Sequence, residues 1–463
     1  MNRRRFLGSI PSVAAGGIVS SHISNALADD VKTEGGNQAV PPVFVSPHCI
    51  YGKVARILMP PDEPPLPQST EFRGLRFTGR QGNYLPKGIQ WGCDTWYPSW
   101  SDDGNLYSSC ADGTLYGTDG RKIEVWCAWG RSPSGYYTNL GGGPANAGGS
   151  TGNAVLVGDD PFQLKITPLQ QYRRLSPRYE GYYPCGNLVH RGVWYYGGYY
   201  CHRWLNPNSV PITYELGGFG GFRISTDKGQ TWQDTPHDDQ RPLFPETGRC
   251  SGGAPIRMGA PHFVDFGRNL EDSPDGYAYL TGHGTYDTDG VANWCSGDAI
   301  SLSRVRPSTS SMNDPNSWEF FAGTDHNGLP MWTRDFRRIQ PIIRWPGGAG
   351  CVNVTYHPVL KRYLGFICGG WFDGDSGTYN TWIVEARSLT GPWSSVALLR
   401  GSFGGQGYFV CMPSKFNRED SRKIILFYSA NWSLNRLGIP TILDSRGPGG
   451  VYSLCVAEFE LLK

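Results

Sequence analysis

The sequence predicts an all-β protein, a β-propeller of five blades. One phrase occurs five times: a short strand, a polar or Gly-containing turn, and an aromatic-rich strand. Measured at the turns Gly104, Gly192, Gly276, Arg362 and Lys423, the steps are 88, 84, 86 and 61 residues. Each step fits one four-stranded antiparallel sheet with its loops, and such units bury both faces only by packing around an axis. Seven blades of about 62 residues are the alternative.

Composition supports this fold class. The chain has 63 Gly, 35 Pro and 61 aromatic residues, which supply turns and packing surfaces more than long helices. A net charge of +2 gives no reason to expect a nucleic-acid partner. After the first thirty residues no run approaches the roughly 18 apolar residues that a membrane-spanning helix needs. We therefore expect a monomer without membrane insertion.

The N-terminal segment is set apart from the fold. Arg3, Arg4 and Arg5 precede Phe6, Leu7 and a modest apolar stretch that ends in small residues, which is typical of a twin-arginine export signal. We expect the signal at residues 1–28, an irregular Pro-containing lead-in at 29–70, and the propeller catalytic domain at 71–463. The protein would then be periplasmic, attached to the cell surface, or secreted.

Twelve cysteines are compatible with disulfides in an exported chain. Seven of them fall inside the repeated strands, where Cys also serves as a small buried apolar residue. There is no Cys-x-x-Cys pair, so a zinc cluster is not predicted, and the sequence leaves any disulfide pairing open.

Residues 225–232 match the Asp-box pattern Ser-x-Asp-x-Gly-x-Thr-Trp. We expect Asp227 to cap a tight turn, Gly229 to supply a positive φ, and Trp232 to pack between blades. This motif predicts architecture, so Asp227 is not a catalytic candidate.

The catalytic candidates lie in the first repeat, where Asp94 and Asp112 occupy adjoining strands among small and aromatic residues such as Trp96. Glycoside cleavage needs such a pair: a carboxyl of raised pKa protonates the leaving oxygen, and an ionised one acts as nucleophile or base. The structural alternative is that Asp112 caps its turn and Asp94 binds backbone amides.

The first repeat also carries a family resemblance. Residues 92–98, residues 103–107 and the Asp112-Gly113 pair resemble the opening blade of a bacterial propeller family that includes endo-D-arabinanases. The phrases at 356–364 and 389–393 are similar to segments of such five-bladed glycosidases. The resemblance implies a glycoside hydrolase in which Asp94 and Asp112 are the catalytic pair. Cys93 and the Asp-box hairpin depart from the family's pattern.

A second set of residues predicts a different reaction. His262 and His283 occupy places in the third repeat that correspond to those of Asp94 and Asp112 in the first. Two imidazoles with a Tyr and an Arg could perform β-elimination on a uronate-containing polysaccharide, since such a lyase needs a base, an acid and a cation. With Asp265, the two imidazoles could instead ligate a metal.

The non-enzyme alternative is a glycan-binding surface protein, which needs aromatic platforms without paired carboxylates. Trp371 is the favoured stacking platform, and Asp373 with Asp375 could bind hydroxyls or calcium. Glu180 lies among aromatic residues and could be a third carboxylate of the funnel. The predicted substrate-binding residues are Trp96, Glu180, Tyr183, Arg338, Tyr356, Trp371 and Asp373, and the expected partner is a polysaccharide or oligosaccharide.

Overall fold

A computed structural model describes residues 64–89, 91–127, 149–174, 179, 181–205, 212–249, 252–286, 292–371, 378–399, 402–403, 407–420, 422–430 and 449–463, with the side chains of 202–205, 212–214, 371 and 378 excepted. The chain divides into two compact units, Met1–Pro42 and Val43–Lys463. All described residues belong to the second unit. The expected signal at 1–28 and most of the lead-in at 29–70 lie outside the described residues.

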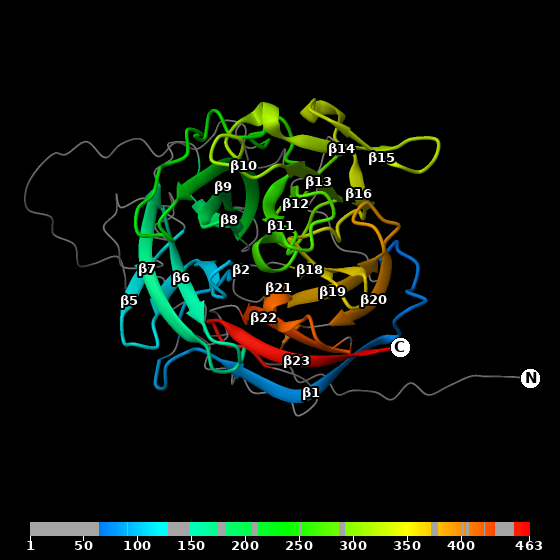
Figure 1. Ribbon diagram of the computed structural model, residues 1–463. Helices are drawn as coiled ribbons and strands as arrows, with labels where there is room; N and C mark the ends of the chain where they lie inside the picture. The colour runs from blue at the N-terminus through cyan, green and yellow to red at the C-terminus, as the bar shows by residue number, and fades with distance from the viewer. Residues whose placement is uncertain are drawn as a thin grey trace, which may run out of the picture. The chain divides into compact units, whose positions relative to one another are not determined.

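Five antiparallel sheets form a five-bladed β-propeller (Figure 1). The first blade consists of β2 (Ser99–Trp100), β3 (Leu106–Cys110), β6 (Gly149–Val157) and β7 (Lys165–Arg174), with the hairpin β4 (Gly113–Tyr116) and β5 (Lys122–Val125) beside it. The second consists of β8 (Gly181–His190), β9 (Val193–Leu205) and β10 (Ile212–Ser225). The third consists of β11 (Gly259–Phe263), β12 (Ala278–Gly284), β13 (Ala299–Val305), β14 (Glu319–Thr324) and β15 (Pro330–Thr333), and β16 (Pro341–Arg344) pairs with β13.

The fourth blade consists of β17 (Val352–His357), β18 (Arg362–Trp371), β19 (Thr378–Ala386) and β20 (Ser394–Leu399). The fifth consists of β21 (Gly407–Cys411), β22 (Lys423–Ala430), β23 (Cys455–Leu462) and β1 (Gly74–Asn83). Four 3₁₀ turns complete the described elements: η1 (Arg268–Leu270), η2 (Pro315–Ser317), η3 (Phe336–Arg338) and η4 (Ser414–Phe416).

The five predicted turns each join the first two strands of one blade. The prediction of an all-β propeller is therefore confirmed, with five blades and not seven. We call the end of the propeller where these turns lie the hairpin end. The opposite end of the propeller carries the residues of the candidate site.

The fifth blade is completed by strands that are far apart in the sequence. β1 pairs antiparallel with β23, from Gly74 opposite Leu462 to Asn83 opposite Cys455. The rings of Phe77 and Phe459 lie 5.7 Å apart across this pair. The last blade is thus held by backbone hydrogen bonds and apolar packing between the two ends of the propeller segment.

The innermost strands of four blades share a one-residue bulge, in which the extra residue is left-handed. These residues are Thr95 (φ 55°), Gly186 (46°), Ala260 (40°) and Phe409 (53°). The residue before each of them pairs with the second strand of its own blade: Asp94 with Ala111, Cys185 with Gly197, Gly259 with His283, and Tyr408 with Ser429. Asp94, Cys185, Gly259 and Tyr408 therefore hold equivalent positions.

The Asp-box motif forms the turn that the sequence predicts. Oδ1 of Asp227 accepts hydrogen bonds from the Ser225 hydroxyl (2.7 Å) and the Thr231 amide (2.8 Å). Trp232 packs on Trp194, 5.1 Å away between ring centroids, in a cluster that also contains Leu169 of the first blade. The motif therefore joins the first two blades, as expected, and Asp227 has a structural role.

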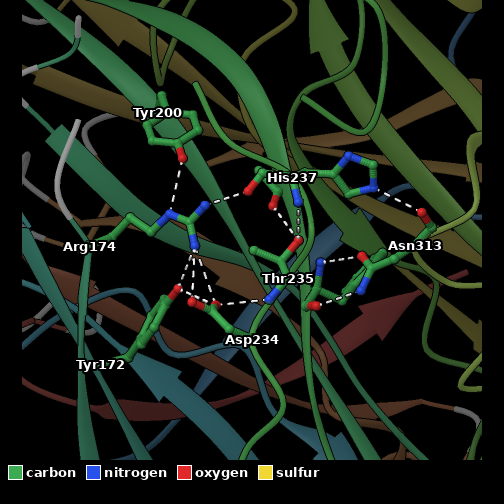
Figure 2. A network of polar contacts seen from close by, with 9 residues as sticks. Tyr172, Arg174, Tyr200, Asp234, Thr235, His237 and Asn313 are labelled. Carbon is green, nitrogen blue, oxygen red and sulfur yellow. Dashed lines mark hydrogen bonds and ion pairs between the residues drawn. The ribbon is translucent and has the colours of Figure 1, made fainter. Parts of the chain in front are cut away.

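A polar network next to this turn joins three blades (Figure 2). Arg174, at the end of β7, donates hydrogen bonds to Tyr200 Oη (3.2 Å), Tyr172 Oη (3.0 Å) and the carbonyl of His237. It also forms an ion pair with Asp234 (3.3 Å). His237 Nε2 lies 2.8 Å from the Asn313 carbonyl oxygen, which extends the network to the third blade.

The ten cysteines of the described residues are buried, which confirms the expected role of strand cysteines as small core residues. Cys49 and Cys250 lie outside the described residues. In the part of the chain that the structure describes, no helix is long and apolar enough to cross a membrane.

Candidate active site

Asp94 and Asp112 lie at the same end of the first blade, opposite its hairpin end. The amide of Asp94 donates to the Ala111 carbonyl (2.9 Å), and the amide of Ala111 donates to the Asp94 carbonyl (2.8 Å). Asp112 follows directly, with φ 39°, where the chain leaves β3 for β4. One isolated bridge thus places the two carboxyl residues on adjoining strands, as the sequence predicts.

The backbone around Asp112 is fixed by close contacts. Oδ1 of Asp112 accepts a hydrogen bond from the Cys127 amide (2.7 Å). Gly113 has φ 138°, and a Cβ there would overlap the carbonyl oxygen of Gly92, which accepts the Thr114 amide at 2.9 Å. Glycine is required at position 113 because two backbone segments meet there. The Asp112-Gly113 pair is therefore a rigid feature that orients the carboxylate.

Asp94 is a buried carboxyl, with 6% of its surface exposed. Burial raises the pKa of Asp94 well above its usual range, and the nearby charge of Asp112 raises it further. A hydrogen bond from the Tyr408 hydroxyl to Oδ2 opposes the increase. The hydroxyls of Thr95 and Tyr452 also lower this pKa, but no hydrogen bond of normal geometry reaches Oδ1 among the described residues. Burial and charge dominate, so Asp94 favours its protonated form.

Aromatic side chains enclose this carboxyl. The ring of Tyr408 lies 5.1 Å from that of Tyr379 and 4.6 Å from that of Phe409. Burial raises the pKa of Tyr408 and of Tyr452 well above the usual value, and Asp94 and Asp112 raise both further. Both phenols therefore stay protonated at ordinary pH and are available as hydrogen-bond donors.

The two histidines are buried residues of the third blade. His262 Nε2 is 3.2 Å from Cys351 Sγ, and its ring centroid is 3.9 Å from that of Tyr97. His283 Nε2 is 2.7 Å from the Asn293 carbonyl oxygen. Burial lowers the pKa of His262 to about 3 and that of His283 to about 4. Both rings are therefore neutral over the ordinary pH range.

The strand registers correct the expected equivalence between the histidines and the carboxylates. Asp94 pairs with Ala111 and Gly259 pairs with His283, so Gly259 stands in the place of Asp94 and His283 in that of Ala111. His262 lies three residues further along β11. It lines a cavity of about 30 Å³ on the propeller axis, and all five blades contribute residues to this cavity. The cavity has room for about one water molecule.

Three further predictions are corrected. Trp96 is buried in an apolar cluster between the first and fifth blades, and its Nε1 donates to the Cys93 carbonyl (3.0 Å), so no ring face is free for a sugar. Tyr356 packs against Tyr363 (5.1 Å) near the hairpin end of the fourth blade. Arg338 is exposed on η3, between outer strands of the third blade, away from the innermost strands.

Tyr183 is buried on the innermost strand of the second blade, at the same end as Asp94. Its ring stacks on Tyr199 (5.9 Å) and meets Trp294 edge-on (5.2 Å), which makes it part of the core. Glu180, Asp373 and the side chain of Trp371 lie outside the described residues, and so does the expected calcium ligation at Asp373. Among the described residues no group of three His, Cys, Asp or Glu side chains could hold a metal ion.

Sequence reasoning missed Tyr408 and Tyr452. Tyr408 holds the position of Asp94 in the fifth blade, and Tyr452 comes just before β23. The repeats gave no signal for either residue. Asp94 comes two residues before the predicted short strand at Trp96, whereas Tyr408 comes three before the one at Cys411, so their equivalence follows only from the strand registers.

No family model and no curated protein match the chain. Solved structures match over most of its length. A family 117 glycoside hydrolase, Zg3597, from Zobellia galactanivorans is 10% identical, with a TM-score of 0.43, over 84% of this chain and 91% of its own. A GH43_1 enzyme from Xanthomonas citri is 12% identical, with a TM-score of 0.38, over 82% and 89%. A glycosyl hydrolase from Bacteroides ovatus is 11% identical, with a TM-score of 0.37, over 87% and 96%. With scores below 0.5, these likenesses say nothing about the reaction or substrate of this chain.

Proposed function

We propose that this chain is a glycoside hydrolase that cleaves glycosidic bonds of a polysaccharide or glycoconjugate with Asp94 and Asp112 as its carboxylate pair. One observation carries the proposal. A buried carboxyl, whose pKa is raised by burial and by a second carboxylate, lies beside that carboxylate on adjoining strands of the first blade. Two carboxyl groups in unlike environments are the arrangement that glycoside cleavage uses.

The environments suggest different roles for the two groups. Asp94, which favours its protonated form, donates a proton to the leaving oxygen. Asp112, oriented by the Cys127 amide, is the second carboxylate and acts as nucleophile or as the base for water. Tyr408 and Tyr452 remain protonated and can donate hydrogen bonds to Asp94 once it has lost its proton. The anomeric configuration of the first product, read by NMR, distinguishes a nucleophilic Asp112 from a water-activating one.

The lyase alternative is less well supported. It requires His262 and His283 together with an Arg and a Tyr. Arg338 and Tyr356 lie on other parts of the propeller, and the other candidate tyrosine, Tyr183, packs between Tyr199 and Trp294. Both imidazoles are also buried in the core. The experiment below would detect elimination by the absorbance of its unsaturated product.

To test the proposal, the protein is incubated with neutral and uronate-containing polysaccharides. D-arabinan is tried first, because the opening blade resembles that of a family that includes endo-D-arabinanases. Reducing ends and the ultraviolet absorbance of unsaturated uronates are followed together. New reducing ends without absorbance support the proposal. Absorbance that rises with them indicates a lyase, and binding without either signal indicates a glycan-binding protein.

Substitutions of the two aspartates test whether they carry the activity. Asp94→Asn and Asp112→Asn should each lower kcat by roughly 10²–10⁴-fold, the usual contribution of general acid–base catalysis. Glu419→Gln removes an exposed carboxylate of the fifth blade and should leave activity unchanged. Full activity in a correctly folded Asp94→Asn protein would contradict the assignment.

The proposal includes export, on the strength of residues 3–7. Cell fractionation of the wild-type protein and of an Arg4→Lys/Arg5→Lys variant tests this. Retention of the variant in the cytoplasm, with the wild-type protein outside it, is the expected result.

A further inference from the structure

A second cavity lies at the hairpin end of the propeller, opposite the end that carries Asp94. Its volume is about 670 Å³. It forms where the β2–β3 and β8–β9 turns, the Gly276 turn and the η1 segment meet, and its floor includes the buried Leu270. The side chains that give it charge or polarity are Asp102, His190, Arg191, Arg268, Glu271 and Arg306.

Two of the arginines that line this cavity donate to backbone carbonyl groups. The guanidinium of Arg268 donates to the backbone carbonyl of Asp102, and that of Arg306 donates to the backbone carbonyl of Asp275 (3.2 Å). Arg306 also lies over the ring of Tyr277, 4.3 Å from its centroid. Among the described residues, Arg191, Arg268 and Arg306 form no ion pair with an acidic side chain.

The negative charges are fewer, and one of them already has a partner. Glu271 forms an ion pair with Arg418 (3.1 Å). Asp102 accepts a hydrogen bond from the Ser101 hydroxyl (2.9 Å). Arg418 also pairs with Asp272. The cavity lining itself carries three arginines against the two carboxylates of Asp102 and Glu271, so its charge favours an anion.

The walls of the cavity are tied together before any ligand binds. His190 Nδ1 lies 3.1 Å from the carbonyl oxygen of Asn269, and Oδ1 of Asn269 accepts the amide of Arg191. Asn269 (φ 56°) and Leu270 (φ 63°) are both left-handed, a conformation that Leu rarely adopts. The strained segment is held by contacts from the second blade, and a preformed site loses less entropy when it binds a ligand.

We infer that this cavity binds the carboxylate or sulfate groups of an acidic saccharide. Guanidinium groups offer paired N–H donors that match the two oxygens of such anions. That the anion belongs to a saccharide depends on the proposed function, whereas anion binding itself does not. A polymer held here would leave the carboxylate end of the propeller accessible, so the site would retain substrate without occupying the catalytic pair.

The test measures binding of dextran, carboxymethyl dextran and dextran sulfate to the full chain by titration calorimetry. The Asp94→Asn background prevents cleavage. Arg268→Gln/Arg306→Gln removes two cavity charges. Arg241→Gln/Arg387→Gln removes two charges from exposed side chains elsewhere, which are 81% and 79% exposed.

We expect the parent protein to bind one or both charged dextrans and not dextran itself. Whichever charged polymer binds identifies the anion. The cavity variant should lose roughly 100-fold in affinity, since each lost charge-assisted hydrogen bond costs at least about tenfold. The control should stay within about threefold.

Equal losses in both variants would show nonspecific attraction and overturn the inference, as would unchanged binding by the cavity variant or equal binding of uncharged dextran. Circular dichroism checks that each variant is folded. An inactive protein that still binds anions through Arg268 and Arg306 would contradict the proposed hydrolase and leave the anion site standing.

Discussion

The hydroxyl of Tyr408 donates a hydrogen bond to Oδ2 of Asp94, and the two residues hold the same position in neighbouring blades. Each precedes a left-handed residue on the innermost strand of its blade. The bulges therefore direct a tyrosine and a carboxyl from two blades toward each other. This contact makes the protonation of Asp94 depend on the fifth blade.

Replacing Tyr408 by Phe should shift the pH profile. The hydroxyl stabilises the ionised form of Asp94, so its loss raises the pKa of Asp94 further. If Asp94 is the proton donor, the alkaline limb of kcat against pH moves to higher pH, by about one unit. Tyr428→Phe, which removes a buried hydroxyl bonded to the Gly449 carbonyl, is the control and should not move it. A shift to lower pH would contradict the role of Asp94 as acid.

Glu246 should make stability depend on pH. It is buried, and desolvation raises its pKa from 4.5 to about 7, although the Arg257 and Met258 amides donate to it. Its contribution to stability is complete below pH 4.5 and is lost as pH increases to about 7, a change of about 3 kcal/mol. Urea unfolding at pH 4 and pH 7.5 should show this loss in wild type and not in Glu246→Gln. Parallel pH dependence in the two proteins would refute it.

Arg174 should contribute to stability through the polar network that joins three blades. Arg174→Ala leaves Tyr172, Tyr200 and the His237 carbonyl without their donor, and should lower the free energy of unfolding by about 2 kcal/mol. The neighbouring exposed Arg173→Ala is the matched control and should cost less than about 0.5 kcal/mol. Chemical denaturation of both variants checks the difference, and equal costs would be evidence against the network.

Gly113→Ala should disturb the site and the fold together. The new Cβ would collide with the Gly92 carbonyl oxygen, at a φ that favours glycine, so we expect a loss of about 3 kcal/mol and of most activity. Gly120→Ala, in the β4–β5 hairpin, also has a positive φ but meets nothing within 4 Å, and should cost about 1 kcal/mol with activity retained. Equal losses of stability in the two variants would mean that the positive φ alone, and not the collision with Gly92, causes the loss.

The sequence predicted the blades because their turns are local. A polar or glycine turn followed by an aromatic strand depends on residues close together in the chain, and all five hairpins formed where expected. The Asp-box turn was equally predictable, since its hydrogen bonds span only a few residues.

The bulges could not be predicted, because an extra residue is defined by the strand opposite it. Strand alternation places Trp96 on the face of Asp94, but left-handed Thr95 interrupts the alternation, and Trp96 enters the core. The contact between Tyr408 and Asp94 joins residues 314 positions apart and arises only from the ring of blades.

The pairing of β1 with β23 affects the stage of folding at which the candidate site is complete. Each of the first four blades is built from one continuous stretch of the chain, so its strands can pair soon after they are synthesised. The fifth blade must join residues nearly four hundred positions apart. Tyr408 belongs to that blade, and Tyr452 immediately precedes its closing strand. The environment of Asp94 is therefore complete only once the fifth blade has closed. A chain whose ring of blades is still open has both carboxylates but lacks the two tyrosines that lower the pKa of Asp94.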